Sequence, residues 1–149
     1  MLIFNNKKYF TAKKSILMIL FLVCFTGFSQ QKKEKLKFKV IAFYTAKNDQ
    51  AHISFVHEAN KRFPKIAQEN HFVYDSTDNW NNLNAKFLAN YQVVLFLDTR
   101  SETQEQRKAF EKYMKGGGGF IGFHFSAFAL NDSDYPQNWN WYHNTFLGS

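Results

Sequence analysis

Two histidines, His52 and His124, are the residues of this chain best suited to acid–base chemistry. His124 ends a short apolar run that follows four glycines, in the stretch GGGGFIGFHF. An imidazole exchanges protons near neutral pH and also binds metal ions. Ser126 lacks the G-x-S-x-G context of a nucleophilic serine. The pattern predicts proton transfer, metal binding or hydrogen bonding to a polyol at His124. The alternative is a structural histidine that bonds to loop backbone.

The glycine run before His124 matches the GxGxxG pattern from Gly117 to Gly122. A dinucleotide fingerprint follows a strand and opens a helix, whereas these glycines follow a helical pattern and open a strand. No Gly-Lys-Ser/Thr follows, so a P-loop is disfavoured too. We therefore interpret Gly116 as a helix C′ cap, and Gly116–Gly119 as a structural turn at the amino edge of a sheet that contacts no ligand.

Short apolar runs alternate with helical periodicity along the chain. Strands are expected at roughly 38–44, 71–75, 92–98 and 119–124. Amphipathic helices are expected at 53–67, where Pro64 should kink or split the helix, weakly at 79–90, and from the Thr103 cap to Gly116. This order predicts an α/β fold, a doubly wound parallel sheet with strand one central and helices on both faces. The tail after Leu130 is expected to be loop-like.

The N-terminus has the layout of a secretory signal peptide. Lysines between Lys7 and Lys14 precede the apolar run Ile16–Phe28, which is shorter than the roughly 20 residues of a membrane-spanning helix. We expect residues 1–29 to be removed on export to the periplasm or the extracellular space, followed by a basic linker at 30–37. The alternative is an uncleaved membrane anchor. After cleavage, no stable membrane span is expected.

The net charge of +7 belongs mainly to the leader and the linker. From Phe38 onward there are 11 basic and 11 acidic residues, so a nucleic-acid partner is disfavoured. The single cysteine, Cys24, lies in the leader, so the expected mature chain has no disulfide or thiolate nucleophile. Aromatic residues make up 19% of the chain, which suits either a Phe-rich core or a sugar-stacking surface.

Several segments resemble the ThuA-like (trehalose utilisation) family. They are the glycine-rich GGGFIGFH, the preceding TQEQRKAFEKYMKGGGG and the strand VVLFLDT. His52-Ile53-Ser54-Phe55 is similar to the start of the family's first helix, and WNWY followed by FLG is similar to its Trp-Tyr…Leu-Val-Gly segment. The resemblance runs from about Lys39 to the last residue. It implies the flavodoxin-like fold of the class I glutamine amidotransferase-like superfamily.

The resemblance also implies a role in carbohydrate metabolism, on trehalose, related glycosides or oxidised disaccharides. His124 stands where amidotransferases carry their cysteine, so glutaminase activity is not implied. Asp49-Gln50-Ala51 replaces the Gly-Phe-Arg that usually precedes the family's first histidine. Because the family pattern continues through further strands and a later histidine, residues 38–149 are expected to be the N-terminal portion of an incomplete domain.

We expect the site at the carboxyl ends of the strands, where open α/β sheets bind ligands. His52 and His124 are expected at adjacent strands one and four, within about 12 Å of each other, a span that one pocket ligand can bridge. Asp98 is expected to orient one of them. The substrate-binding candidates are Thr45, Thr99, Ser126, Trp141 and Tyr142, with His124 facing the same crevice as Thr45 and Thr99. Two histidines and a carboxylate also suit zinc, so a metal stays open, and the sequence names no cofactor.

Three functions remain open from the sequence. The first is an enzyme that acts on a small carbohydrate through the two histidines. The second is a carbohydrate-binding module in which Trp139, Trp141 and Tyr142 form a stacking platform, although these aromatics could instead be a lid packed on the sheet edge. The third is a fragment with no activity of its own.

Overall fold

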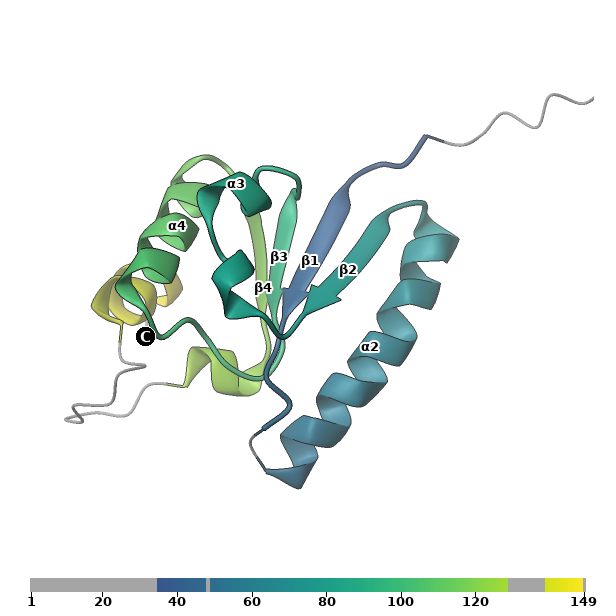
Figure 1. Cartoon of the computed structure of the whole chain (residues 1–149), viewed down its shortest axis with the longest axis horizontal. Helices are drawn as coiled ribbons and strands as arrows, with labels where there is room; N and C mark the ends of the chain where they lie inside the picture. Colours follow the sequence, from purple (N-terminus) through teal and green to yellow (C-terminus); the bar gives the residue numbers. More distant parts are fainter. Residues whose placement is uncertain (1–34, 48, 129–138, 149) are drawn as a thin grey trace, which may run out of the picture. The chain divides into compact units, whose positions relative to one another are not determined.

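The computed structural model describes residues 35–47, 49–128 and 139–148. The expected signal peptide and most of the expected linker lie outside the described residues. Four strands form one sheet in the order β2-β1-β3-β4, and every pairing is parallel (Figure 1). The strands are β1 (Lys39–Phe43), β2 (Val73–Thr77), β3 (Val93–Phe96) and β4 (Gly119–Gly122). The predicted parallel sheet with strand one in its interior is confirmed, although β2 begins two residues later than expected.

Alternate residues of the central strands enter two separate cores, as the two-residue period of a strand requires. Val40, Ala42 and Leu95 pack with Val56 and Ala59 of α2 (Gln50–Asn70). The opposite face packs against α3 (Ala85–Leu88) and α4 (Gln104–Lys115), with a core that includes Ile41, Phe43, Val94, Phe96, Leu88 and Phe110. Helices therefore cover both faces of the sheet, which confirms the doubly wound α/β fold (Figure 1).

Helix α2 runs without interruption through Pro64, so the expected division of the helix into two pieces at this proline is wrong. Pro64 is exposed, while its neighbour Phe63 packs against Tyr74 and Phe123 with ring centroids 5.4 and 6.1 Å apart. An interior proline removes one backbone hydrogen bond, at a cost of about 3 kcal/mol. The apolar contacts on both sides of Pro64 hold the helix in place across that gap.

Helix α4 begins as the sequence predicts. The Thr103 hydroxyl accepts a hydrogen bond from the Gln106 amide, and the Gln106 side chain accepts one from the Thr103 amide, which is a capping box. At the other end, Gly116 has an ordinary φ of −81° and Gly117 has the left-handed φ of 88°. The C′ position is therefore Gly117 rather than Gly116.

Two connections differ from expectation. The predicted weak helix at 79–90 is two short pieces, the 3₁₀ turn η1 (Trp80–Asn82) and α3. The tail is not entirely loop, because Trp141–Leu147 form a π-helix, η3, whose aromatic side chains pack on Phe110 and Phe120. The remaining residues of that tail before Trp139 lie outside the described residues.

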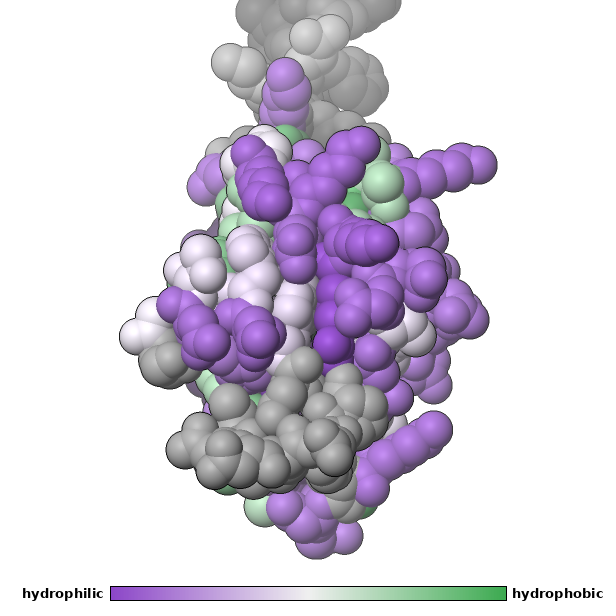
Figure 2. Space-filling model, turned by 90° about the vertical axis from the view of Figure 1, so that its left-hand side faces the viewer, coloured by the Kyte–Doolittle hydropathy of each residue, from purple (hydrophilic) through white to green (hydrophobic). Residues whose placement is uncertain are grey.

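The surface on the α4 side is dominated by hydrophilic side chains (Figure 2). Large exposed apolar side chains in the described part of the chain are few and dispersed over several elements: Leu36, Phe55, Ile121, Phe128 and Leu147. Within this described part, no helix is both long and apolar enough to cross a bilayer.

Candidate functional site at the carboxyl edge of the sheet

His52 and His124 are in direct contact. Nε2 of His52 lies 3.1 Å from Nδ1 of His124, and the rings stack with an interplanar angle of 22°. His52 stands in the first turn of α2, and His124 opens the 3₁₀ turn η2 (His124–Ala127) that follows β4. The expectation that they lie within about 12 Å is confirmed. However, β1 and β4 are not adjacent, because β3 lies between them.

The backbone of His124 is held in an unusual conformation. Its φ is 35°, in the left-handed region that side chains other than Asn and Asp adopt at a cost. Close packing fixes this turn, since a Cβ at Gly122 would lie 2.6 Å from the Ser126 hydroxyl oxygen. Arg100 Nη1 also donates a hydrogen bond of 3.1 Å to the carbonyl of Phe125. A strained residue at the end of a strand marks a functional candidate.

Asp49 is the carboxylate that contacts the histidine pair. Its Oδ2 lies 2.8 Å from Nδ1 of His52, while its Oδ1 accepts hydrogen bonds from the amides of Ala51 and His52 as the N-cap of α2. These hydrogen bonds, first the one from the His52 amide and then the one from its ring, hold the pKa of Asp49 below its usual value. The sequence interpretation missed this residue, although an Asp three positions before a His at a helix start is a usable signal.

Asp98, the expected partner of a histidine, makes different contacts. It is fully buried and accepts hydrogen bonds from the Thr45 amide at 2.8 Å, the Thr45 hydroxyl at 2.9 Å and the Ala46 amide at 2.6 Å. Ala46 has a left-handed φ of 53°, so the carboxylate secures a tight turn after β1. Asp49 therefore makes a contact with a histidine of the kind expected of Asp98, while Asp98 secures the loop after β1. A catalytic role for Asp98 stays a prediction.

Thr45 and Thr99 line a hollow of about 270 Å³ at the same edge of the sheet. Its other lining residues are Lys47, Trp80, Arg100, Glu102, Thr103 and Gln106. Neither histidine is among them, and the expectation that His124 faces the same crevice as Thr45 and Thr99 stays a prediction. Trp80 packs on the α3/α4 face of the sheet, whereas His52 is carried by α2 on the opposite face.

Comparison with known proteins places this fold in a family. A family model described as ThuA, trehalose utilisation, matches residues 39–149. The chain belongs to the ThuA family. A crystal structure of a protein from Bacteroides uniformis described as ThuA-like superposes with a TM-score of 0.67 and 31% sequence identity, over 82% of this chain and 48% of that chain. This chain thus spans about half the length of that protein. A comparison with curated proteins finds no match.

Three of the expected substrate-binding residues of this ThuA-family chain are wholly or partly covered. Ser126 and Tyr142 are fully buried and Trp141 is half-buried. Burial raises the pKa of Tyr142 to about 12. Trp141 stacks on Phe146, with ring centroids 5.1 Å apart, and both pack against the core. The aromatic tail therefore has the packed arrangement that was the alternative to a stacking platform.

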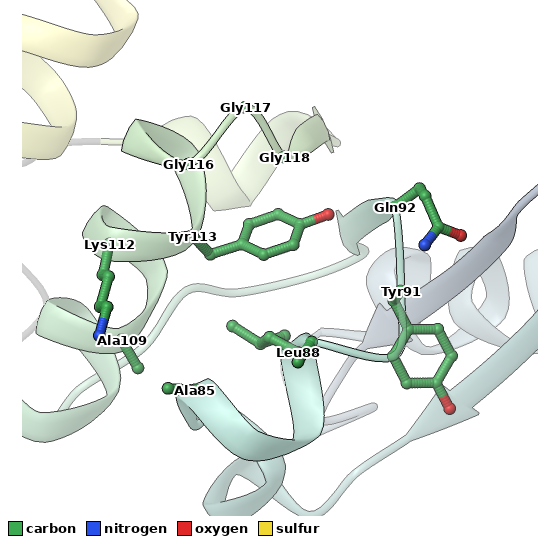
Figure 3. Close-up of a pocket in the computed structure, with 11 residues that line it drawn as sticks. Ala85, Leu88, Tyr91, Gln92, Ala109, Lys112, Tyr113, Gly116, Gly117 and Gly118 are labelled. Atoms are coloured by element: carbon green, nitrogen blue, oxygen red, sulfur yellow. The ribbon is translucent and has the colours of Figure 1, made fainter.

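The glycine turn lies at the opposite, amino edge of the sheet, as expected. The Gly119 amide bonds to the carbonyl of Gln92, just before β3. The ring of Tyr113 lies beneath the turn, where a Cβ at Gly118 would come within 2.1 Å of it (Figure 3). Gly116, Gly117 and Gly118 line a hollow of about 370 Å³ between α3 and α4, so the turn is structural and also borders a hollow. The prediction that it contacts no ligand stays a prediction.

The histidine contacts of the ThuA-family site form a chain from Asp49 through His52 to His124. A metal ion instead needs several ligand atoms that converge on one point. Within residues 35–47, 49–128 and 139–148, no three His, Cys, Asp or Glu side chains gather in that way. The arrangement is suited to moving a proton along a line of hydrogen bonds.

Proposed function

We propose that this ThuA-family chain acts on a small carbohydrate, a disaccharide, glycoside or oxidised derivative of one, with His124 as the general base and acid. The observation that carries the proposal is the 3.1 Å contact between His124 and His52, which in turn contacts Asp49. The carbohydrate class comes from membership of a family described by trehalose utilisation. The substrate and the reaction are proposals.

We infer the positions of the protons in the resting pair from these contacts. Asp49 is ionised at neutral pH, because its pKa is lowered, so it accepts from Nδ1–H of His52. Nε2 of a neutral His52 then carries a lone pair and accepts from Nδ1–H of His124. This leaves the lone pair of His124 on Nε2. Because His124 is exposed, we infer that this nitrogen meets the substrate.

Proton transfer along this chain keeps charge and atoms balanced. Nε2 of His124 takes a proton from a sugar hydroxyl or a water molecule, and the Nδ1 proton of His124 passes to Nε2 of His52. The positive charge then rests on His52 beside the Asp49 carboxylate, where the opposite charge stabilises it. The reverse transfer delivers a proton to a leaving oxygen. Glutaminase chemistry is excluded from the proposal, because the residues from Phe38 to Ser149 include no cysteine.

The test is turnover with variants of the pair. Purified protein is incubated with trehalose, related glycosides and oxidised disaccharides, and the products are followed by NMR spectroscopy. His124→Ala should lose at least 100-fold in turnover, the usual range for a lost general base being about 10²–10⁴, with little change in sugar affinity. His57→Ala is the matched control, because His57 is an exposed histidine of α2, the helix that carries His52. Equal turnover by the His124 and His57 variants would refute the proposal.

A binding module is the second candidate, but the observed burial gives it little support. Trp139 and Tyr142, two of the three platform aromatics, are 5% and 0% exposed. If sugar binding persists in His124→Ala and is lost in Trp141→Ala, with no turnover by the unmodified protein, the module is favoured over the enzyme.

We further propose that the chain is exported and loses residues 1–29. The support is the order of basic, apolar and small residues in the leader. Mass spectrometry of the secreted protein should find Gln30 as its first residue; an intact Met1 would contradict this.

A further inference from the structure

We propose that the hollow lined by Thr45, Trp80, Thr99 and Arg100 holds one uncharged sugar ring of the substrate, with the Trp80 indole against its carbon face. The inference rests on the proposed function for its ligand class. It adds a binding site at the carboxyl edge of the sheet, with Trp80 on the α3/α4 side. Four further residues complete the lining: Lys47, Glu102, Thr103 and Gln106.

Trp80 offers a fixed apolar surface. Its one polar atom, Nε1, is already used in a 3.0 Å hydrogen bond to the carbonyl of Tyr44. Its ring packs against Phe43 and Phe96, with centroids 5.3 and 5.2 Å apart. The indole therefore presents carbon atoms to the hollow and loses little side-chain entropy when a ligand binds. Sugar rings have a C–H face that suits such a surface, since aromatic faces carry negative charge.

The rest of the lining is polar in a way that suits hydroxyl groups. Thr45, Thr99 and Gln106 supply neutral hydroxyl and amide groups, which both donate and accept hydrogen bonds. Lys47 and Arg100 are cationic, but Glu102 places an anionic group on the same lining. A bound anion would have to approach that carboxylate, whereas an uncharged polyol can bond to both kinds of charge. The mixed lining therefore favours a neutral sugar over a phosphate or a sugar acid.

The size of the hollow limits what it holds. At about 270 Å³ it falls just below the roughly 300–1,000 Å³ of pockets that enclose drug-sized ligands. One sugar ring fits this scale. We infer that the remainder of a longer substrate lies outside the hollow.

Arg100 connects this hollow to the turn that carries His124. Its side chain is 2% exposed, lines the hollow, and donates through Nη1 to the carbonyl of Phe125, the residue after His124. A sugar ring that contacts Arg100 is thus joined through one side chain to η2. We infer that the hollow holds the ring that anchors the substrate, and that the reacting bond extends from it toward η2.

The first test is an NMR titration of the ¹⁵N-labelled protein with glucose, methyl glucoside and trehalose. The indole N–H signals of Trp80, Trp139 and Trp141 give a built-in comparison. We expect saturable shifts at Trp80 and at the Thr99 and Gln106 backbone amides, with Trp139 and Trp141 unchanged. Saturable shifts confined to Trp141 or to the hollow between α3 and α4 that Tyr113 and Gly116 line would overturn the inference. The absence of any saturable shift would overturn it too. Tighter binding of gluconate or inorganic phosphate at Trp80 would also overturn it.

The second test uses two variants that change the lining by different means. Thr99→Val removes one hydroxyl at nearly constant shape and should weaken binding about fivefold, the value of one hydrogen bond. Trp80→Phe should weaken it by about three- to tenfold, the range of an aromatic contact. His57→Ala, an exposed change on α2, is the control and should bind normally. Unchanged affinity in both Thr99→Val and Trp80→Phe contradicts the subsite.

Turnover separates this inference from the proposed function. If the Thr99→Val and Trp80→Phe proteins turn over substrate with unchanged KM, the subsite is wrong and the enzymatic proposal stands. If the sugar shifts Trp80 but the unmodified protein has no turnover, the subsite stands and the enzymatic proposal fails.

Discussion

The imidazole rings of His52 and His124 meet with Nε2 and Nδ1 3.1 Å apart, although 72 positions separate the two residues in the chain. One ring comes from the first turn of α2 and the other from the end of β4, two strands away from β1. Their contact depends on the packing of α2 against the sheet, including Phe55 against Phe123 with ring centroids 5.1 Å apart. The pair is a product of the tertiary fold.

The backbone strain at His124 leads to a stability prediction. Because φ is 35°, His124→Gly should be more stable than His124→Ala by about 1 kcal/mol, since glycine adopts this region without a Cβ clash. Both variants should lose turnover. Urea unfolding gives the comparison. An alanine variant as stable as the glycine variant would show that the turn relaxes to an ordinary conformation once the imidazole is removed.

The close packing of Gly122 on Ser126 predicts a site that tolerates no added methyl group. Gly122→Ala places a Cβ 2.6 Å from the Ser126 hydroxyl oxygen and should destabilise the fold by about 1–3 kcal/mol. Gly116→Ala is the matched control, because its nearest atoms are 3.4 Å away and its φ is −81°. Adding Ser126→Ala to Gly122→Ala should recover part of the loss. Thermal unfolding of the four proteins checks this, and equal losses for both glycines would contradict it.

The buried carboxylate of Asp98 predicts a large effect from a small change. Asp98→Asn replaces one carboxylate oxygen by an NH2 group, which cannot accept a hydrogen bond from the Thr45 amide, the Thr45 hydroxyl or the Ala46 amide. We therefore expect a loss of about 2–3 kcal/mol in the free energy of unfolding. Asp78→Asn serves as an exposed control, with a change below about 0.5 kcal/mol. Denaturant titration measures both. Equal stability of the two variants would show that Asp98 does not secure the loop.

Asp49 predicts a pH dependence with a definite sign. Its pKa is held below the ordinary aspartate value of 3.8, so its stabilising contacts are fully present above that value and are lost as pH falls through the lower folded-state pKa. The unmodified protein should therefore exceed Asp49→Asn in stability by a constant margin above about pH 5 as far as this group is concerned, and the two proteins should converge below about pH 4. Thermal unfolding as a function of pH tests this. A difference between the two proteins that stays unchanged down to about pH 3 would contradict it.

The fold was predictable because its signals are local. The central strands β1 and β3 are short apolar runs buried by helices on both faces. Thr103 with Gln106 gives a capping box that the sequence displays directly. Pro64 misled the prediction because local backbone preference counts for less than the packing of Phe63 and Ala67 around it. The helix at Trp141–Leu147 was missed because its polar, aromatic sequence lacks a helical apolar period.

The site was predictable only in part. The topology placed both histidines at the carboxyl edge. It could not show that Thr45 and Thr99 line a hollow whose lining includes neither histidine. Choosing between Asp98 and Asp49 required side-chain directions. Asp98 turns toward the loop after β1, whereas Asp49 reaches His52 within a single helical turn.

Asp49 couples the opening of the first turn of α2 to the release of the His52 ring. One carboxylate oxygen holds the first amides of α2 and the other holds the His52 ring. Fraying of that first turn therefore releases the imidazole at the same moment, and the histidine contact cannot persist while the helix end is open. The rate of hydrogen exchange at the Ala51 and His52 amides therefore reports how often the His52 and His124 rings separate, and it can be measured without a substrate.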